Sequence, residues 1–183
     1  TDEGWWAHNA RQQALFGHWI MDDHNPPLWS RPVYSFLLWL VYQALGVGLI
    51  QTRLLSGLAG VVTCFAGYGF VRHEATPRAA FVSALVLGAG YFMLSNTRVA
   101  FTETLQLAFV VIAILAALRS RAAPAWGAVS AAGLLLAMLT KPSAAPAALV
   151  IAVLYAAPLV GSRKRSAELV TRWRAALVFG ATA

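Results

Sequence analysis

Long apolar stretches separated by short polar or basic segments fill the chain after residue 53. A helix needs about 20 mostly apolar residues to cross the hydrocarbon core of a bilayer. The pattern predicts an all-α fold, a polytopic bundle of transmembrane helices with about five complete spans and the start of a sixth near residue 170. The expected spans are residues 54–71, 79–97, 99–118, 122–140 and 142–161.

The segment at residues 33–50 is nearly uncharged and has two interpretations. It could span the membrane, which would put the acidic residues near the N-terminus on the face opposite Glu103. It could instead be an interfacial segment or a re-entrant hairpin, for which its tryptophan, tyrosine and glycines are typical. We favour the second interpretation. We therefore expect residues 1–53 to form a first exterior loop with juxtamembrane segments, and residues 54–183 to form the helix bundle.

The composition agrees with a membrane protein. The chain is 59% hydrophobic and only 11% charged, whereas a soluble domain carries about 25% charged residues. The net charge of +7 does not require a nucleic-acid partner, because membrane proteins concentrate Lys and Arg in cytoplasmic loops. The single cysteine excludes an internal disulfide. Because the chain starts without Met and stops within an apolar run, we expect it to be an internal piece of a larger protein.

Basic residues mark alternate ends of the expected spans. Placing these clusters on the cytoplasmic side gives a consistent topology in an inner membrane. The loops at 95–102 and 141–143 then face the periplasm or exterior. The basic clusters are Arg72 with Arg78, Arg119 with Arg121, and residues 163–165.

The few carboxylates fall at particular places along the chain. Of seven Asp and Glu residues, Asp2 and Glu3 stand at the N-terminus, and Glu103 stands alone beside a long apolar run. A carboxylate at the mouth of a membrane helix is costly to desolvate and indicates a functional site by default. With the expected topology, these three acids emerge on one membrane face. Asp2 and Glu3 would also suit the start of a helix, where acids cap the chain.

A histidine and two aspartates precede a pair of prolines. Asp22, Asp23 and His24 could together hold a divalent metal. A polar turn made rigid by Pro26 and Pro27 would explain the same residues.

Several cations lie on the expected outer side. Arg98 lies near Glu103, and Glu103 could equally form an ion pair with a neighbouring helix. Lys141 could hold a phosphate as a point charge or extend to the lipid headgroups. Three outer arginines run against the usual charge bias of membrane proteins and are candidates for binding lipid phosphate, namely Arg11, Arg31 and Arg53.

Taken in order along residues 2–150, these motifs resemble the polyprenyl-phosphate-dependent GT-C glycosyltransferases. That group includes protein O-mannosyltransferases and the bacterial transferases that add aminoarabinose to lipid A. The resemblance is carried by Asp2-Glu3 with Trp6-Ala7 and Ala10-Arg11, by His24-Asn25-Pro26-Pro27-Leu28, by Gly46 and Arg53-Leu54, by Ser95-Asn96-Thr97-Arg98 with Glu103, and by Leu139-Thr140-Lys141.

The resemblance implies a sugar donor on a polyprenyl phosphate and a protein, lipid or glycan acceptor, with membrane lipids around the protein. It also implies a catalytic first acid, Asp2, with Glu3 beside it, and a second acidic position at Glu103. Asp2 would be the general base of an inverting transfer. The expected phosphate contacts are Arg11, Asn25, Arg98 and Lys141, and the expected metal ligand is His24.

Two other classes of protein would also place ionisable residues near helix ends. A transporter or flippase for a lipid or small solute would use them along its substrate pathway. Against this reading, the sequence shows no charge in the middle of a span and no inverted repeat. A non-catalytic scaffold would use the same carboxylates as caps and ion pairs only.

Overall fold

The structure is a computed structural model that describes residues 2–19 and 31–161. Within these two ranges it is helical and has no strand, which confirms the predicted all-α class. Its helices are α1 (Asp2–Phe16), α3 (Pro32–Leu45), α4 (Leu49–Glu74), α5 (Pro77–Ala89), α6 (Tyr91–Thr97), α7 (Thr102–Arg119), α8 (Ala125–Thr140) and α9 (Pro146–Gly161), with a 3-10 turn η1 (Pro142–Ala144) before α9. The span expected near residue 170 lies outside the described residues.

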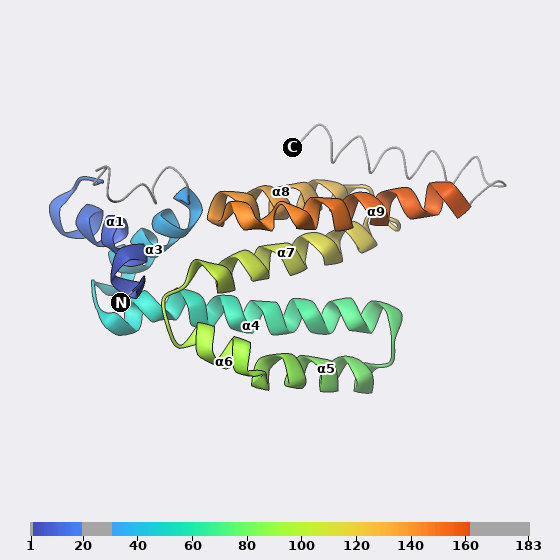
Figure 1. Cartoon of the computed structure of the whole chain (residues 1–183), viewed down its shortest axis with the longest axis horizontal. Coiled ribbons are helices and arrows are strands. Elements are labelled where there is room, and N and C mark those ends of the chain that lie inside the picture. The colour runs from blue at the N-terminus through green and yellow to red at the C-terminus, as the bar shows by residue number, and fades with distance from the viewer. Residues whose placement is uncertain (1, 20–30, 162–183) are drawn as a thin grey trace.

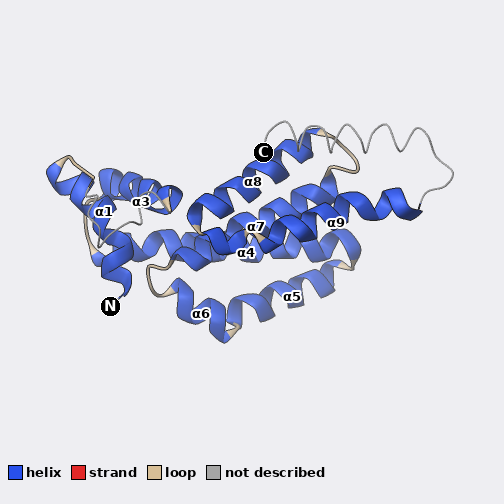
Figure 2. Ribbon diagram, turned by 45° about the horizontal axis from the view of Figure 1, so that its top comes forward, coloured by secondary structure: helices blue, strands red, loops and turns tan. Residues whose placement is uncertain are grey.

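The long helices form an elongated bundle, and the first two helices gather at one end of it (Figure 1). We call this the α1/α3 end. The N-termini of α4 and α7 and the C-termini of α6 and α8 lie there, and α3 contacts α1, α4 and α8. The α4–α5 and α7–α8 connections lie at the opposite end (Figures 1 and 2).

In the part of the chain that the structure describes, two helices are long and apolar enough to cross a membrane, α4 over Leu49–His73 and α7 over Thr102–Arg119. A third span is formed if α5 and α6 are counted together, although they are bent by 56° where the sequence pattern predicted one continuous helix at 79–97. Gly90 takes an extended backbone conformation between them and interrupts the helix. Helices α8 and α9 are shorter and apolar, and they occupy the positions of the last two expected spans.

Helix α3 is too short to cross a bilayer by itself. Its 14 residues give a length of about 21 Å, against a hydrocarbon core of about 30 Å. It begins with a proline in the first helical turn and ends at Gly46, whose φ of 79° is readily adopted only by glycine. Its place at the α1/α3 end is the one expected of an interfacial helix. Helix α4 begins at Leu49 rather than near residue 54, and the division of the chain at residue 53 stays a prediction.

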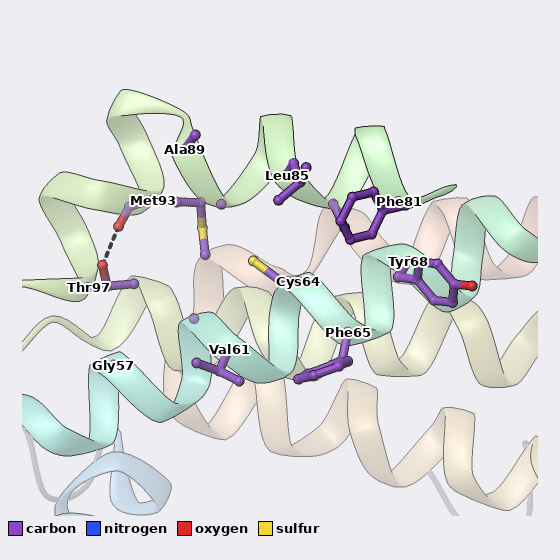
Figure 3. Close-up of a pocket in the computed structure, with 13 residues that line it drawn as sticks. Gly57, Val61, Cys64, Phe65, Tyr68, Phe81, Leu85, Ala89, Met93 and Thr97 are labelled. Carbon is purple, nitrogen blue, oxygen red and sulfur yellow. Dashed lines mark hydrogen bonds between the residues drawn. The ribbon is translucent and has the colours of Figure 1, made fainter. Parts of the chain in front are cut away.

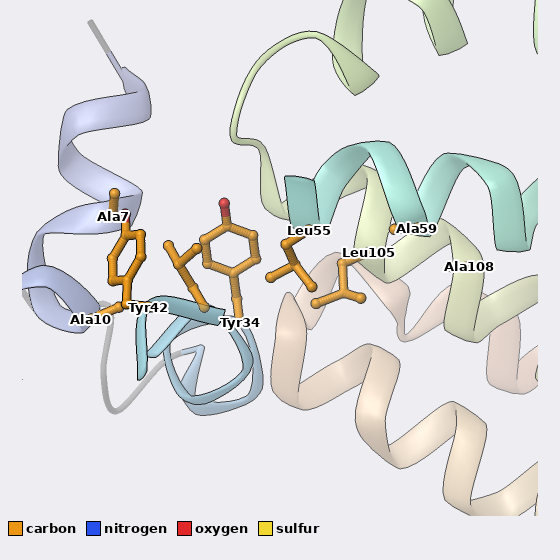
Figure 4. Packing of buried hydrophobic residues seen from close by; sticks show 9 residues of the cluster. Ala7, Ala10, Tyr34, Tyr42, Leu55, Ala59, Leu105 and Ala108 are labelled. Carbon is orange, nitrogen blue, oxygen red and sulfur yellow. The ribbon is translucent and has the colours of Figure 1, made fainter. Parts of the chain in front are cut away.

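A cluster of buried residues joins the first helices to the bundle. Tyr34 and Tyr42 of α3 lie between α1 and the first turns of α4 and α7 (Figure 4), and Leu38 of α3 belongs to the same cluster. The other members are Ala7, Ala10, Leu55, Ala59, Leu105 and Ala108. Because this cluster is shared by four helices, it sets where α1 and α3 lie relative to the start of α7.

The contact between α7 and α8 depends on small residues. A Cβ built on Gly133 would lie 3.1–3.3 Å from the Cβ, Cα and N of Ala113. In the same contact, the Ser130 hydroxyl donates a hydrogen bond of 2.9 Å to the Ala113 carbonyl. Small residues and hydroxyl bonds of this kind let helices approach closely within a membrane. This close, antiparallel contact places the start of α7 beside the end of α8.

Candidate functional site

An ion pair between two helices lies at the α1/α3 end. Glu103 is in the first turn of α7 and Lys141 follows the last residue of α8. The Lys141 Nζ donates a hydrogen bond to the Glu103 Oε1. The Thr102 hydroxyl donates to the other carboxylate oxygen, Oε2, at 3.1 Å. Of the alternatives open for Glu103, the structure forms the ion pair with a neighbouring helix.

The ion pair is held in place yet remains accessible. The side chains of Lys141 and Glu103 are 24% and 34% exposed, so solvent and ligands reach both groups. The two oxygens of Glu103 are already engaged by a cation and a hydroxyl. A carboxylate in this state is suited to orienting a substrate hydroxyl and less suited to taking a proton from it, since the ammonium group stabilises its charged form.

A small cavity of about 290 Å³ opens beside Glu103. Gln106 and Ser143 lie on its wall, and the Gln106 Nε2 donates a hydrogen bond of 3.1 Å to the Ser143 hydroxyl. Leu107 and Val110 line the same cavity farther along α7. The sequence reasoning missed Gln106 and Ser143. Gln106 had a signal in its spacing, since it follows Glu103 by three positions and so lies on the same helix face. Ser143 had no such signal.

Arg31 precedes α3 and has an unusual environment. Its guanidinium carbon lies 3.9 Å from the centre of the Trp6 ring, in a cation–π contact. Its Nε and Nη1 atoms are buried, and no acceptor among the described residues bonds to them. Burial lowers the pKa of Arg31, while the negative charge of Glu103 raises it in part. Arg31 is nevertheless a cation at any physiological pH.

The other predicted phosphate contacts differ in their surroundings. Arg11 is exposed on α1, and its Nη2 lies 3.3 Å from the His8 Nδ1. Its charge also acts on Tyr42 of α3. Arg98 is exposed in the α6–α7 connection. Both arginines therefore belong to the α1/α3 end, and the hydrogen bonds and ion pair described for Glu103 and Lys141 involve neither of them.

Some predicted residues are located only in part. Helix α1 begins at Asp2, so the backbone of Asp2 and Glu3 lies at the α1/α3 end (Figure 1), and nothing is described of their side chains. His24 and Asn25 lie outside the described residues. In the ranges that the structure does describe, no group of three or more His, Cys, Asp or Glu side chains could hold a metal ion.

A long apolar groove of about 780 Å³ runs between α4 and the bent pair α5–α6 (Figure 3). Thr97 and Met93 line the part nearer the α1/α3 end, and Tyr68 and Phe81 line the part farther from it. Its walls carry few polar atoms, so a hydrocarbon chain would find apolar contacts along its whole length.

The comparison with protein families gives a match over most of the chain. Residues 24–182 match the family model described as dolichyl-phosphate-mannose-protein mannosyltransferase. No curated protein and no solved structure matches the chain. The match covers most of the chain and includes α3, the Glu103–Lys141 pair and the apolar groove.

Proposed function

The chain belongs to the dolichyl-phosphate-mannose-protein mannosyltransferase family and is a membrane glycosyltransferase of the GT-C type, and from this premise we propose the reaction that it catalyses. It moves a sugar from a polyprenyl-phosphate donor to a hydroxyl of a protein, lipid or glycan acceptor. The transfer takes place at the α1/α3 end and inverts the anomeric carbon.

One observation carries the choice of this end. The accessible Glu103–Lys141 pair lies at the same end of the bundle as the start of α1, where the backbone of Asp2 begins the helix. Two carboxylates at one end can take two different roles, and the one held by an ammonium group is the less suited to proton removal. We assign proton removal to Asp2, with Glu3 beside it, and orientation of the acceptor to Glu103.

The chemistry requires little from the protein beyond these groups. Asp2 takes the proton of the acceptor hydroxyl while the oxygen of that hydroxyl attacks the anomeric carbon. The bond from that carbon to the phosphate oxygen breaks, and the electron pair leaves with the phosphate. General base catalysis of this kind contributes about 10²–10⁴ in rate. A single displacement from the face opposite the phosphate inverts the anomeric centre.

Cations at the same end receive the departing phosphate. Arg11, Arg98 and Lys141 carry the positive charge, and Asn25 of the proline loop is the expected polar contact. Preorganised donors of this kind stabilise charge that develops on a leaving group. The apolar groove between α4 and α5–α6 would hold part of the polyprenyl chain, since it opens within the membrane-spanning region.

The orientation in the membrane is also part of the proposal. Basic residues at the far end of the bundle favour the cytoplasmic side, which leaves the α1/α3 end on the periplasmic or exterior face of an inner membrane. They are Arg72, Arg78, Arg119 and Arg121. Attaching a membrane-impermeant thiol reagent to single cysteines placed in each loop, in a Cys64→Ser background, would test this orientation.

A divalent cation at Asp22, Asp23 and His24 stays a prediction. No step of the reaction above requires it. Dialysis of the purified protein against a chelator, followed by addition of Mg²⁺, Mn²⁺ or Zn²⁺, would test it. Transfer that is lost and then regained would support a metal site, and transfer that is indifferent to the chelator would remove it.

The test of the proposal is sugar transfer from a radiolabelled polyprenyl-phosphate sugar by membranes that carry Asp2→Asn. We expect a loss of about 10²–10⁴ in rate. Glu74→Gln, at the opposite end of α4, is the matched control and should transfer normally. Analysis of the product with anomer-specific glycosidases should show inversion. Unchanged transfer by Asp2→Asn would refute the role of Asp2, and a retained anomeric configuration would refute the single displacement.

A further inference from the structure

A separate cavity lies at the end of the bundle opposite the α1/α3 end, where α4 and α7 end. Its volume is about 620 Å³, and residues of these two helices line it. Its polar part is formed by Arg72 and His73 in the last turn of α4 and by Arg119 in the last turn of α7. The rest of the lining is mainly apolar and reaches Val62 on α4 and Leu115 on α7.

The two arginines reach this cavity from different helices. The guanidinium carbon of Arg119 lies 5.1 Å from the centre of the Trp126 ring on α8, in a cation–π contact. Gly69 leaves room for Arg119 on the α4 side, since a Cβ built on Gly69 would lie 3.9 Å from the Arg119 Nη2. The Arg72 Nη1 donates a hydrogen bond of 3.3 Å to the carbonyl of Ala75, which follows α4. A guanidinium group has five N–H donors, more than these contacts use.

The cavity has the depth of a lipid headgroup together with the start of an acyl chain. The two candidate spans, Leu49–His73 and Thr102–Arg119, end at its polar part, so its cations lie at the level of the lipid headgroups. Its apolar lining continues from His73 to Val62, which is about 16 Å along α4. A molecule with an anionic head and an apolar tail would contact both parts.

Positive charge at such a helix end also has simpler explanations. It can set the topology of the chain, and it is favourable at the C-terminus of a helix dipole. Arg78 and Arg121, at the same end of the bundle, fit these explanations because neither lines the cavity. Arg72 and Arg119 differ from them, since two separate helices bring these side chains to one cavity with an apolar lining.

We propose that this cavity binds an anionic phospholipid of the surrounding bilayer, with its phosphate on Arg72 and Arg119 and an acyl chain along the apolar lining. Basic pockets between transmembrane helices on the cytoplasmic side bind anionic headgroups in this way. The cavity is separate from the proposed reaction site, since Arg119 lies about 24 Å along α7 from Glu103. The inference therefore does not depend on the proposed function.

The test is lipid binding by the purified protein in detergent micelles, with native mass spectrometry giving the Kd for phosphatidylglycerol. We expect Arg72→Gln and Arg119→Gln each to raise this Kd about fivefold, as for loss of one cation beside an anionic headgroup. Arg78→Gln and Arg121→Gln are the matched controls, because they remove the same charge at the same end, and should bind as the wild type does. Equal weakening by all four variants would overturn the proposal, since net charge alone would then attract the lipid.

Two other ligands identify the occupant. Phosphatidylcholine carries a phosphate but no net charge, and we expect it to bind more weakly than phosphatidylglycerol. Inorganic phosphate in large excess should not displace phosphatidylglycerol, because it makes no contact with the apolar lining. Equal binding of phosphatidylcholine would overturn the choice of an anionic lipid. Displacement by inorganic phosphate would overturn the choice of a lipid.

Acidic residues of the chain itself are the competing partners of the two arginines. Nothing is described of the side chain of Glu74, which follows Arg72 by two positions, and Glu168 lies outside the described residues. We expect Glu74→Gln and Glu168→Gln to bind phosphatidylglycerol with the wild-type Kd. A Kd about 10-fold lower in either variant, as for release of a hydrogen-bonded charge, would overturn the proposal and give the arginines to that acid. Should Arg119→Gln not fold, Arg72→Gln must still raise the Kd above that of Arg78→Gln for the proposal to stand.

Discussion

The ion pair between Glu103 and Lys141 joins α7 to the end of α8, and replacing it should change stability in a characteristic way. We consider Glu103→Leu, Lys141→Met and the double variant, because these apolar side chains form no hydrogen bond with the remaining partner. Each single variant leaves a charged group without its partner, which costs about 1–3 kcal/mol. The double variant leaves no unpaired charge.

The magnitude of the coupling follows from exposure. Fully exposed ion pairs contribute about 0.2–1 kcal/mol, and hydrogen bonds to charged groups contribute about 1.5–3 kcal/mol. Because the side chains are 24% and 34% exposed, solvent screens the pair only in part. We expect a coupling free energy of about 1–2 kcal/mol, between these two ranges. The double variant should then be about as stable as either single variant.

The assay is equilibrium unfolding of the purified protein in mixed micelles with increasing SDS, followed by tryptophan fluorescence. Glu103→Leu combined with Arg72→Met is the control cycle, since Arg72 lies at the opposite end of α4 and should show additive effects. Distant sites add to within about 0.3–0.5 kcal/mol. If Glu103→Leu and Lys141→Met are additive to that precision, the two residues are not paired and our reasoning on the site fails.

Further predictions concern the packing that positions the site. Gly133→Val should destabilise the protein by about 1–3 kcal/mol, because the new side chain meets Ala113 on α7. Gly57→Ala, where the added Cβ meets nothing within 4 Å, should leave the unfolding midpoint equal or higher. Tyr42→Phe should lower the free energy of unfolding by about 0.5–1.5 kcal/mol in the same assay, since it removes the hydroxyl that shares a 2.6 Å hydrogen bond with Thr52. Burial raises the pKa of Tyr42, so its contribution to stability is present below the unfolded pKa of about 10 and is lost as pH rises through the folded pKa. An ultraviolet titration of wild type against Tyr42→Phe would show whether one tyrosine ionises late.

The helices were predictable because their signal is local. A run of apolar residues between basic residues is visible in the sequence, and α7 and α8 lie close to the expected ranges. The break between α5 and α6 was not predicted, because residues 79–97 are apolar on both sides of Gly90. Whether a glycine in such a run bends the helix depends on the neighbouring helices. Here α6 packs closely on α4, since a Cβ on Gly60 of α4 would lie 2.4 Å from Thr97 of α6.

The two charged residues of the candidate site were predictable, but their pairing was not, and neither were Gln106 and Ser143 beside them. Glu103 and Lys141 each stand out as a charge at the end of an apolar run. Which of them meet depends on how closely α7 packs against α8, and that contact is set by Gly133 and Ser130. The surroundings of Arg31 could not be predicted, since its contact with Trp6 joins residues that lie 25 positions apart in the sequence. The roles assigned to Asp2 and Glu3 stay predictions.

The most direct test of the account is the rate at which the purified protein, in liposomes, moves labelled mannose from polyprenyl-phosphate mannose to an acceptor peptide or lipid. We predict transfer by the wild type and by Arg78→Gln, and a rate about 10- to 100-fold lower for Glu103→Gln, because the acceptor is no longer held in place. Uptake of the labelled donor without any transferred product would contradict the account and favour a transporter. Equal transfer by Glu103→Gln and Arg78→Gln would place the reaction away from the α1/α3 end.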